Sequence, residues 1–118
     1  MQDVCVFCGS SPGEDPVFMQ SAKALGEAIG KASMGLVYGG AHVGLMGQVA
    51  DAVLAGGQKV VGVIPQSFAH KVSHTELTEL HVVDSMHTRK AMMFELAGAC
   101  IALPGGFGTL EELTEVLT

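Results

Sequence analysis

Charged side chains are scarce in this sequence. Asp, Glu, Lys and Arg make up 15% of its 118 residues, against about 25% in an average soluble domain. A chain so poor in charge is neither a disordered tail nor a typical solvated helical bundle. Hydrophobic residues reach 48%, which suits a parallel sheet covered on both faces. The length fits one domain, and we expect a second subunit to cover part of the apolar surface.

Basic residues and long apolar runs are also in short supply. Six Lys and Arg stand against twelve Asp and Glu, a net charge of −6, so nothing electrostatic favours binding to a nucleic-acid polymer. Backbone amides can still bind small anions. No run approaches the ~20 apolar residues of a membrane span, and the start at Met1–Asp3 lacks the basic region of a signal peptide. We therefore expect a cytoplasmic enzyme or small-molecule binder.

Cysteine is limited to Cys5, Cys8 and Cys100. The first two have the C-x-x-C spacing, which can mark a redox pair or half a metal site. They lie within the apolar run Val4–Cys8, where residues three apart in a strand face opposite sides. We interpret them as small buried residues of a strand.

Apolar runs alternate with stretches of helical periodicity. We predict strands at Val4–Cys8, Gly35–Tyr38, Lys59–Ile64, Leu80–Asp84 and Cys100–Leu103, and helices from Pro16, over Leu45–Leu54, over Met86–Ala97 and from about Leu110. The polar stretch Gln66–Thr78 predicts a loop with room for one helical turn. This alternation is typical of βαβ units. It indicates an α/β fold, a Rossmann-like doubly wound parallel sheet in a single domain over residues 1–118.

Two expectations follow from that pattern. Ligands of such sheets bind outside the carboxyl ends of the strands, so function is expected in the loops after the first, second, fourth and fifth strands. The last predicted helix reaches Thr118 with no stop signal, which we interpret as a C-terminally incomplete chain.

Glycine-rich turns follow three of the predicted strands. None has the G-x-x-x-x-G-K-[ST] pattern of a Walker loop. The second strand ends in Tyr38 and not in an acidic residue that would bind a ribose, so NAD binding is disfavoured. Gly39 and Gly40 join a strand to a helix, where glycine either lets backbone amides approach a ligand or allows tight helix–sheet packing.

The turn at 103–112 is the most specific of these. A strand is followed by three glycines and then by Thr109 at the expected start of a helix. Amides in such a turn favour an anion such as a phosphate. Thr109 and Glu112 also match a T-x-x-E capping box, so Glu112 is either a structural cap or a catalytic carboxylate.

Arg89 and Lys90 break a local rule. With Asp84 or Ser85 as the N-cap, both cations lie near the first turn of a helix, where they oppose its dipole at a cost of roughly 0.3–1 kcal/mol. Two of only six basic residues therefore occur at the carboxyl edge of the expected sheet. We attribute this to an anionic ligand, and the alternative is a pair of surface side chains lying along apolar surface.

These segments resemble the LONELY GUY family of cytokinin riboside 5′-monophosphate phosphoribohydrolases, long mislabelled as lysine decarboxylases. The family pattern P-G-G-x-G-T-x-x-E is present as Pro104–Glu112, and the Met-His-x-Arg-Lys stretch as Met86–Lys90. Phe-Cys-Gly-Ser-Ser and Tyr-Gly-Gly are present as Phe7–Ser11 and Tyr38–Gly40. The resemblance extends over essentially the whole chain.

The resemblance implies a homodimer that hydrolyses the N-glycosidic bond of adenine-type nucleoside 5′-monophosphates, including N6-prenylated ones, to free base and ribose 5-phosphate. It gives Arg89 and Glu112 the catalytic places. The candidate substrate-binding residues, from the resemblance, the glycine turns and the apolar Met86, are Gly39, Gly40, Met86, Lys90, Gly105, Gly106, Phe107, Gly108, Thr109, Leu110, Glu111 and Thr118. Two departures are Lys71, where many members have an acidic residue, and the end at Thr118, beyond which members continue.

The implied chemistry requires no metal and no cofactor. Cleavage of a ribose–base bond builds positive charge on the sugar ring, which the Glu112 carboxylate can stabilise. Two other hypotheses stay open: the same chemistry on AMP or another purine nucleotide, and a non-catalytic carrier of a nucleotide or phosphorylated cofactor. Amino-acid decarboxylation is disfavoured because no pyridoxal-phosphate lysine site is visible.

The histidines and three of the methionines have no assigned catalytic role. His70, His74 and Glu76 do not form an H-E-x-x-H motif, so we interpret both histidines as solvated loop residues and not as zinc ligands. His87 either contacts ligand or supports the site, and His42 is assigned no chemistry. The methionines Met86, Met92 and Met93 either line an apolar base pocket or fill the core.

Overall fold

Five parallel strands form one sheet with helices on both faces. The computed structural model describes residues 3–9 and 15–103. Its elements are β1 (Val4–Phe7), α1 (Pro16–Lys31), β2 (Leu36–Tyr38), α2 (Gly44–Ala55), β3 (Val60–Pro65), α3 (Gln66–Val72), β4 (Glu79–Val83), α4 (Met86–Leu96) and β5 (Ala99–Ala102). The strand order is β4-β3-β2-β1-β5, and all neighbouring strands are parallel. The predicted Rossmann-like α/β fold is confirmed.

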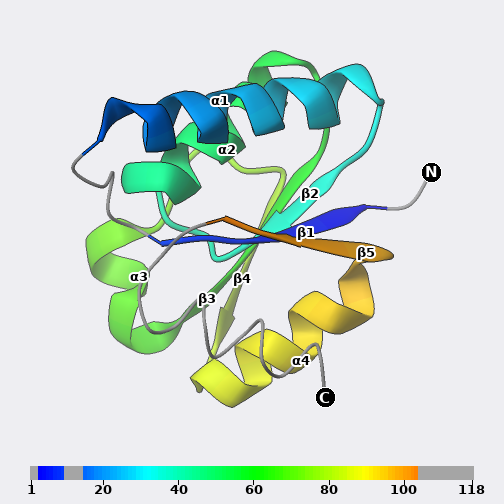
Figure 1. The fold of residues 1–118 in the computed structure, drawn as a ribbon. Helices are drawn as coiled ribbons and strands as arrows, with labels where there is room; N and C mark the ends of the chain where they lie inside the picture. The colour runs from blue at the N-terminus through cyan, green and yellow to red at the C-terminus, as the bar shows by residue number, and fades with distance from the viewer. Residues whose placement is uncertain (1–2, 10–14, 104–118) are drawn as a thin grey trace.

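The sheet separates two hydrophobic cores. Val4 and Val6 pack with α1 and α2, whereas Cys5 and Phe7 pack with Met93 of α4. Figure 1 shows this arrangement, with α1 and α2 above the sheet and α4 below it. Successive side chains of β1 therefore enter opposite cores, as strand geometry requires.

The interpretation of the C-x-x-C spacing is confirmed. Cys5 and Cys8 are both buried, and they belong to different cores. None of the three cysteines forms a disulfide. Sulfur atoms on opposite sides of a sheet cannot serve as a redox pair.

Helices α1 and α4 begin at side-chain caps. Asp15 accepts a hydrogen bond from the Val17 N–H at 3.0 Å, and Pro16 follows it at the first helical position. Ser85 accepts from the Thr88 N–H at 3.1 Å. The N-cap predicted at Asp84 or Ser85 is thus Ser85, and this places Arg89 at the end of the first turn of α4.

The stretch Gln66–Thr78, predicted as a loop with room for one helical turn, contains a longer helix than that. Gln66–Val72 form α3, a helix of seven residues, which is about two turns. The helix packs against β3 and β4. Such a short helix owes its stability to tertiary packing and not to its own periodicity, which is why the local pattern did not reveal it.

Candidate active site

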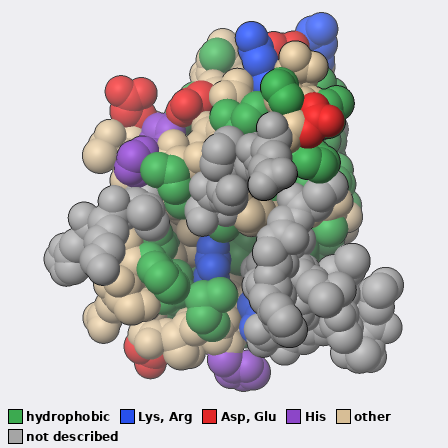
Figure 2. Space-filling model, turned by 60° about the vertical axis from the view of Figure 1, so that its left-hand side comes forward, with side chains coloured by type: hydrophobic (Ala, Val, Ile, Leu, Met, Phe, Trp, Pro, Cys, Tyr) green, Lys and Arg blue, Asp and Glu red, His purple; other side chains and the backbone are tan. Residues whose placement is uncertain are grey.

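A cleft of about 370 Å³ opens at the carboxyl edge of the sheet. The ends of β2 and β3, the helix α3 and the start of α4 surround it. The described residues that line the cleft are Gly39, Ala41, Met46, Ile64, Pro65, Phe68, Met86 and Arg89. Figure 2 shows basic side-chain atoms recessed between hydrophobic side chains. The cleft lies where parallel sheets of this class bind their ligands.

Arg89 links two strand ends from inside the molecule. Its Nε donates to the Val63 carbonyl at 2.9 Å, and its Nη2 donates to the Gly39 carbonyl at 3.0 Å. The side chain also contacts the Met86 sulfur through Nη1 at 3.5 Å. Arg89 and Lys90 are each only 7% exposed, so the alternative of two surface side chains is wrong. A guanidinium held this way presents fixed positive charge to the cleft.

Gly39 makes room for that guanidinium. A Cβ at position 39 would lie 1.8 Å from Nη2 of Arg89, far inside van der Waals contact. Gly40 has φ +85°, a conformation that side chains disfavour. The Tyr38 hydroxyl donates to the Ala41 carbonyl at 2.8 Å across the same turn. Close packing on Arg89 therefore explains Gly39, and the positive φ explains Gly40.

Gly39→Ala is expected to lower the free energy of unfolding by about 1–3 kcal/mol, because the new methyl group displaces the guanidinium from two carbonyls. Gly30→Ala is the matched control, since its Cβ would meet nothing closer than 3.6 Å and alanine favours a helix. Urea denaturation measures both. A Gly39→Ala protein as stable as the wild type would contradict the packing described.

The apolar wall of the cleft was missed by sequence reasoning. Ile64 and Pro65 end β3, and Phe68 follows on α3 with 49% of its surface exposed. The loop after the third strand was left out of the expected functional loops. The signal was available, because β3 ends at the same sheet edge as its parallel neighbours.

The structure brings together some of the predicted site residues. Gly39, Met86 and Arg89 line the cleft, and Gly40 adjoins Gly39. Lys90 is buried but is not among the described residues that line the cleft. The predicted residues Gly105, Gly106, Phe107, Gly108, Thr109, Leu110, Glu111, Glu112 and Thr118 lie outside the described residues. The pairing of Arg89 with Glu112 stays a prediction.

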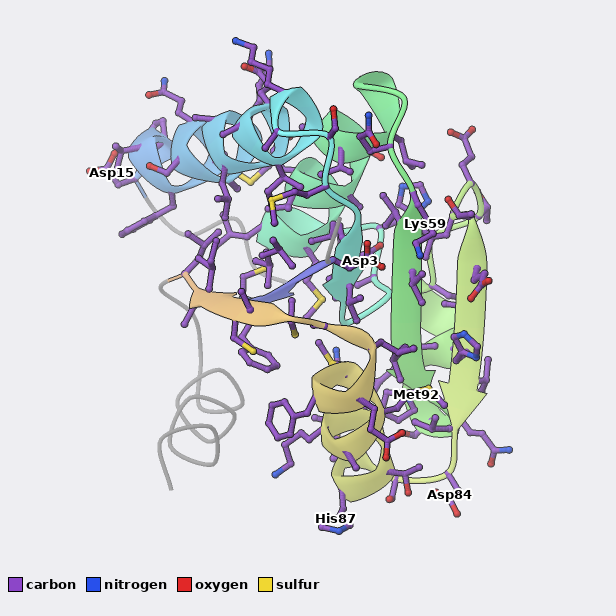
Figure 3. All side chains as sticks on the ribbon, turned by 90° about the vertical axis from the view of Figure 1, so that its right-hand side faces the viewer. Asp3, Asp15, Lys59, Asp84, His87 and Met92 are labelled. Carbon is purple, nitrogen blue, oxygen red and sulfur yellow. The ribbon has the colours of Figure 1, made fainter. Side chains whose placement is uncertain are left out.

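The histidines divide in the structure. His74 is 8% exposed, so its interpretation as a solvated residue is wrong. His87 is exposed and projects from the start of α4 away from the sheet (Figure 3). His42 is exposed too. Within residues 3–9 and 15–103, no three His, Cys, Asp or Glu side chains gather as a metal site.

The remaining methionines have separate roles. Met93 is buried in the core under α4, and Met92 packs against that core. Met86, by contrast, lines the cleft and is 37% exposed. Of the two interpretations, core packing holds for Met92 and Met93, and a place in the cleft holds for Met86.

Tyr38 and Lys59 both have a raised pKa. Burial, followed by the nearby Asp51 carboxylate, raises the pKa of Tyr38 far above its ordinary value, so its hydroxyl stays a hydrogen-bond donor. At the amino ends of β1 and β3, Lys59 and Asp3 form an ion pair at 3.0 Å (Figure 3), and the hydrogen bond with Asp3 raises the pKa of Lys59. That ion pair lies at the edge opposite the cleft.

Comparison with known sequences identifies relatives. A family model described as possible lysine decarboxylase matches residues 46–118. The cytokinin riboside 5′-monophosphate phosphoribohydrolase of Rhodococcoides fascians is 56% identical over 99% of this chain and 60% of its own length. The Arabidopsis thaliana protein of that name, LOG7, is 49% identical over 98% of this chain and 54% of its own. The chain therefore spans little more than half the length of these relatives.

Solved structures share the fold at lower identity. The molybdenum cofactor binding protein of Rippkaea orientalis has a TM-score of 0.83 at 23% identity, over 99% of this chain and 71% of that one. The molybdenum cofactor carrier protein of Chlamydomonas reinhardtii has a TM-score of 0.81 at 19% identity, with the same coverages. At such identities the likeness concerns the fold alone. The family model and the curated relatives, in contrast, show that this chain belongs to the LONELY GUY family, whose model is described as possible lysine decarboxylase.

Proposed function

We propose that the protein hydrolyses the N-glycosidic bond of adenine-type nucleoside 5′-monophosphates, and that residues 1–118 are its nucleotide-binding domain. The observation that carries the proposal is the buried Arg89 guanidinium, which faces an apolar cleft at the carboxyl edge of a parallel sheet. The names of the curated relatives support the same activity.

The cleft has two kinds of surface, as a nucleotide requires. Arg89 supplies positive charge for a phosphate or for the ribose hydroxyls. Met46, Phe68 and Met86 supply apolar surface for the flat face of a purine and for an apolar substituent on it. A phosphate-bearing sugar and an apolar base therefore both find matching surface in one cleft.

The proposed reaction breaks the C1′–N bond and forms a bond between C1′ and a water oxygen. As the C1′–N bond breaks, its electron pair leaves with the base, and positive charge develops on the ribose ring. The Glu112 carboxylate stabilises that charge and accepts a proton from the attacking water, whose oxygen bonds to C1′. The base takes up a proton from solvent, Glu112 releases to solvent the proton it took from water, and ribose 5-phosphate leaves. Backbone amides of Gly106–Thr109 hold the phosphate, so binding energy from the remote end orients the scissile bond.

The direct test is product analysis. The purified protein is incubated with AMP and, separately, with N6-prenylated AMP, and free base and ribose 5-phosphate are measured by chromatography. Release of both products in equal amounts supports the proposal, and the ratio of the two rates shows whether the prenyl group matters. Failure to release base from either nucleotide would refute it.

No observation favours the non-catalytic carrier over the hydrolase. The structural neighbours named for the molybdenum cofactor are 19–23% identical to this chain, and such a likeness concerns the fold alone. The curated relatives at 49–56% identity have names that denote a hydrolase.

Phe68→Ala is expected to raise KM for the nucleotide about three- to tenfold with little change in stability. The side chain lines the cleft and is already half exposed, so its removal costs the fold little but removes apolar surface from the base. Val17→Ala is the matched control, because Val17 is 48% exposed on α1. Steady-state kinetics measures KM for both variants and for the wild type. Equal KM values for Phe68→Ala and wild type would remove Phe68 from the site.

We also propose a homodimer. Leu80, Val82, Leu96 and Ile101 are large apolar side chains that are more than one-third exposed, which supports a covering partner. Light scattering of the purified protein tests this.

A cytoplasmic location is likewise proposed, on the sequence argument alone. Among the residues that the structure describes, no helix is long and apolar enough to span a membrane.

A further inference from the structure

Asp51 and His74 form a polar pair next to the Gly39–Ala41 loop at the cleft. Asp51 on α2 and His74 after α3 are joined by a contact of 2.6 Å between Oδ1 and Nε2. His74 is buried, whereas the Asp51 side chain is 63% exposed. The imidazole is therefore largely shielded from solvent, whereas its carboxylate partner is not. Neither residue lines the cleft within the described part of the chain.

The contacts of His74 determine its tautomer. Nδ1 accepts a hydrogen bond from the Glu76 N–H at 3.0 Å, so this nitrogen carries no proton. The proton of the neutral ring is then on Nε2, which donates to the Asp51 carboxylate. Both ring nitrogens are engaged, so this imidazole is neither a general base nor a metal ligand in this arrangement. Its role is to join α2 to the segment after α3.

The segment after α3 also binds the Gly39–Ala41 loop, which contacts Arg89. The His74 backbone N–H donates to the Gly40 carbonyl at 2.9 Å, and Ser73 forms an antiparallel bridge with Ala41. The carbonyl just before it, that of Gly39, accepts from Arg89. Two successive carbonyls thus bind two different partners, and a rotation of the peptide between them disturbs both hydrogen bonds.

We propose that Asp51 and His74 are positioning residues, which hold the Gly39–Ala41 loop and thereby orient Arg89 at the cleft. The catalytic part of this inference rests on the proposed function. The charge-assisted hydrogen bond from Nε2 to Asp51 fixes the ring. The ring fixes the backbone at residues 74–76, and the His74 amide fixes Gly40.

Substitutions of Asp51 test the chain of contacts. Asp51→Ala removes the acceptor, yet alanine suits the middle of α2. We expect kcat/KM for AMP to fall about tenfold, because a small misplacement of a binding group is costly. Asp51→Asn keeps an acceptor oxygen and is expected to recover most of that loss. Glu79→Ala is the matched control, since it removes a His–carboxylate contact of 3.1 Å, with His81, on the edge strand β4; its kcat/KM is expected to be unchanged.

Amide hydrogen exchange supplies a readout that needs no activity. In Asp51→Ala the His74 amide is expected to exchange about tenfold faster, while the Leu36 amide, bonded to the Lys59 carbonyl in the sheet, keeps its wild-type rate. Unchanged exchange at His74 would overturn the proposal, and so would equal acceleration at Leu36, which signals general loosening. If the wild type releases no base from either nucleotide, the proposed function fails. The His74 and Leu36 rates then still decide whether Asp51 holds the loop.

Discussion

Glu112→Gln is expected to lower turnover by ~10²–10⁴ while it lowers the free energy of unfolding by at most ~1 kcal/mol. A neutral amide neither stabilises positive charge on the ribose ring nor accepts a proton from water. Glutamine nevertheless fits the last position of a capping box as well as glutamate does. The substitution therefore removes the proposed chemistry and keeps the proposed cap. Steady-state turnover of AMP and urea denaturation measure the two effects separately.

Unchanged turnover in this variant would assign Glu112 a structural role. A normal turnover number in Glu112→Gln would mean that the residue only caps its helix, a role that glutamine also fills. Glu95→Gln serves as control, because Glu95 is an exposed carboxylate on α4, and the same loss of one negative charge is expected to leave turnover unchanged.

Arg89→Ala is expected to lower kcat/KM by about 10² or more and to destabilise the fold by about 2–4 kcal/mol. The destabilisation arises because the Val63 and Gly39 carbonyls lose buried donors. The kinetic loss arises because the cleft loses its fixed positive charge. Kinetic measurements with AMP below the unfolding transition report the second effect by itself.

Arg89→Lys separates charge from geometry. An ammonium keeps the positive charge but cannot reproduce the planar fork that reaches two strand ends. We expect it to recover part of the affinity for the nucleotide and little of the stability. Unchanged kinetics in both Arg89 variants would exclude this side chain from the site. Lys31→Ala, at the far end of α1, controls for the loss of one positive charge.

Local sequence rules predict two residues of the site, Arg89 and Gly39. Arg89 was singled out because a cation in the first turn of a helix is unfavourable, and the structure places it in the cleft. Gly39 was singled out because glycines between a strand and a helix permit close approach. Here the approach is made by Arg89, 50 residues away in the sequence, which no local pattern identifies.

The errors have a common physical cause. The polar neighbours of His74 predict a side chain in solvent, but the residue is buried and contacts Asp51, 23 residues earlier. The helix α3 lacks apolar periodicity, and packing on the sheet stabilises it. In both cases the decisive interaction comes from a distant part of the chain, so a window of neighbouring residues does not contain it.

By itself the sequence determined the class of fold and the edge at which a ligand would bind. Runs of apolar residues alternating with helical periods permit few arrangements other than a parallel sheet with helices on both faces, and such a sheet has one ligand-binding edge. Only the tertiary structure decided which side chains meet at that edge. It placed Phe68 and Arg89 in one cleft and joined the Asp51–His74 pair to the Gly39–Ala41 loop. These contacts depend on strand order and helix packing, which bring distant residues together.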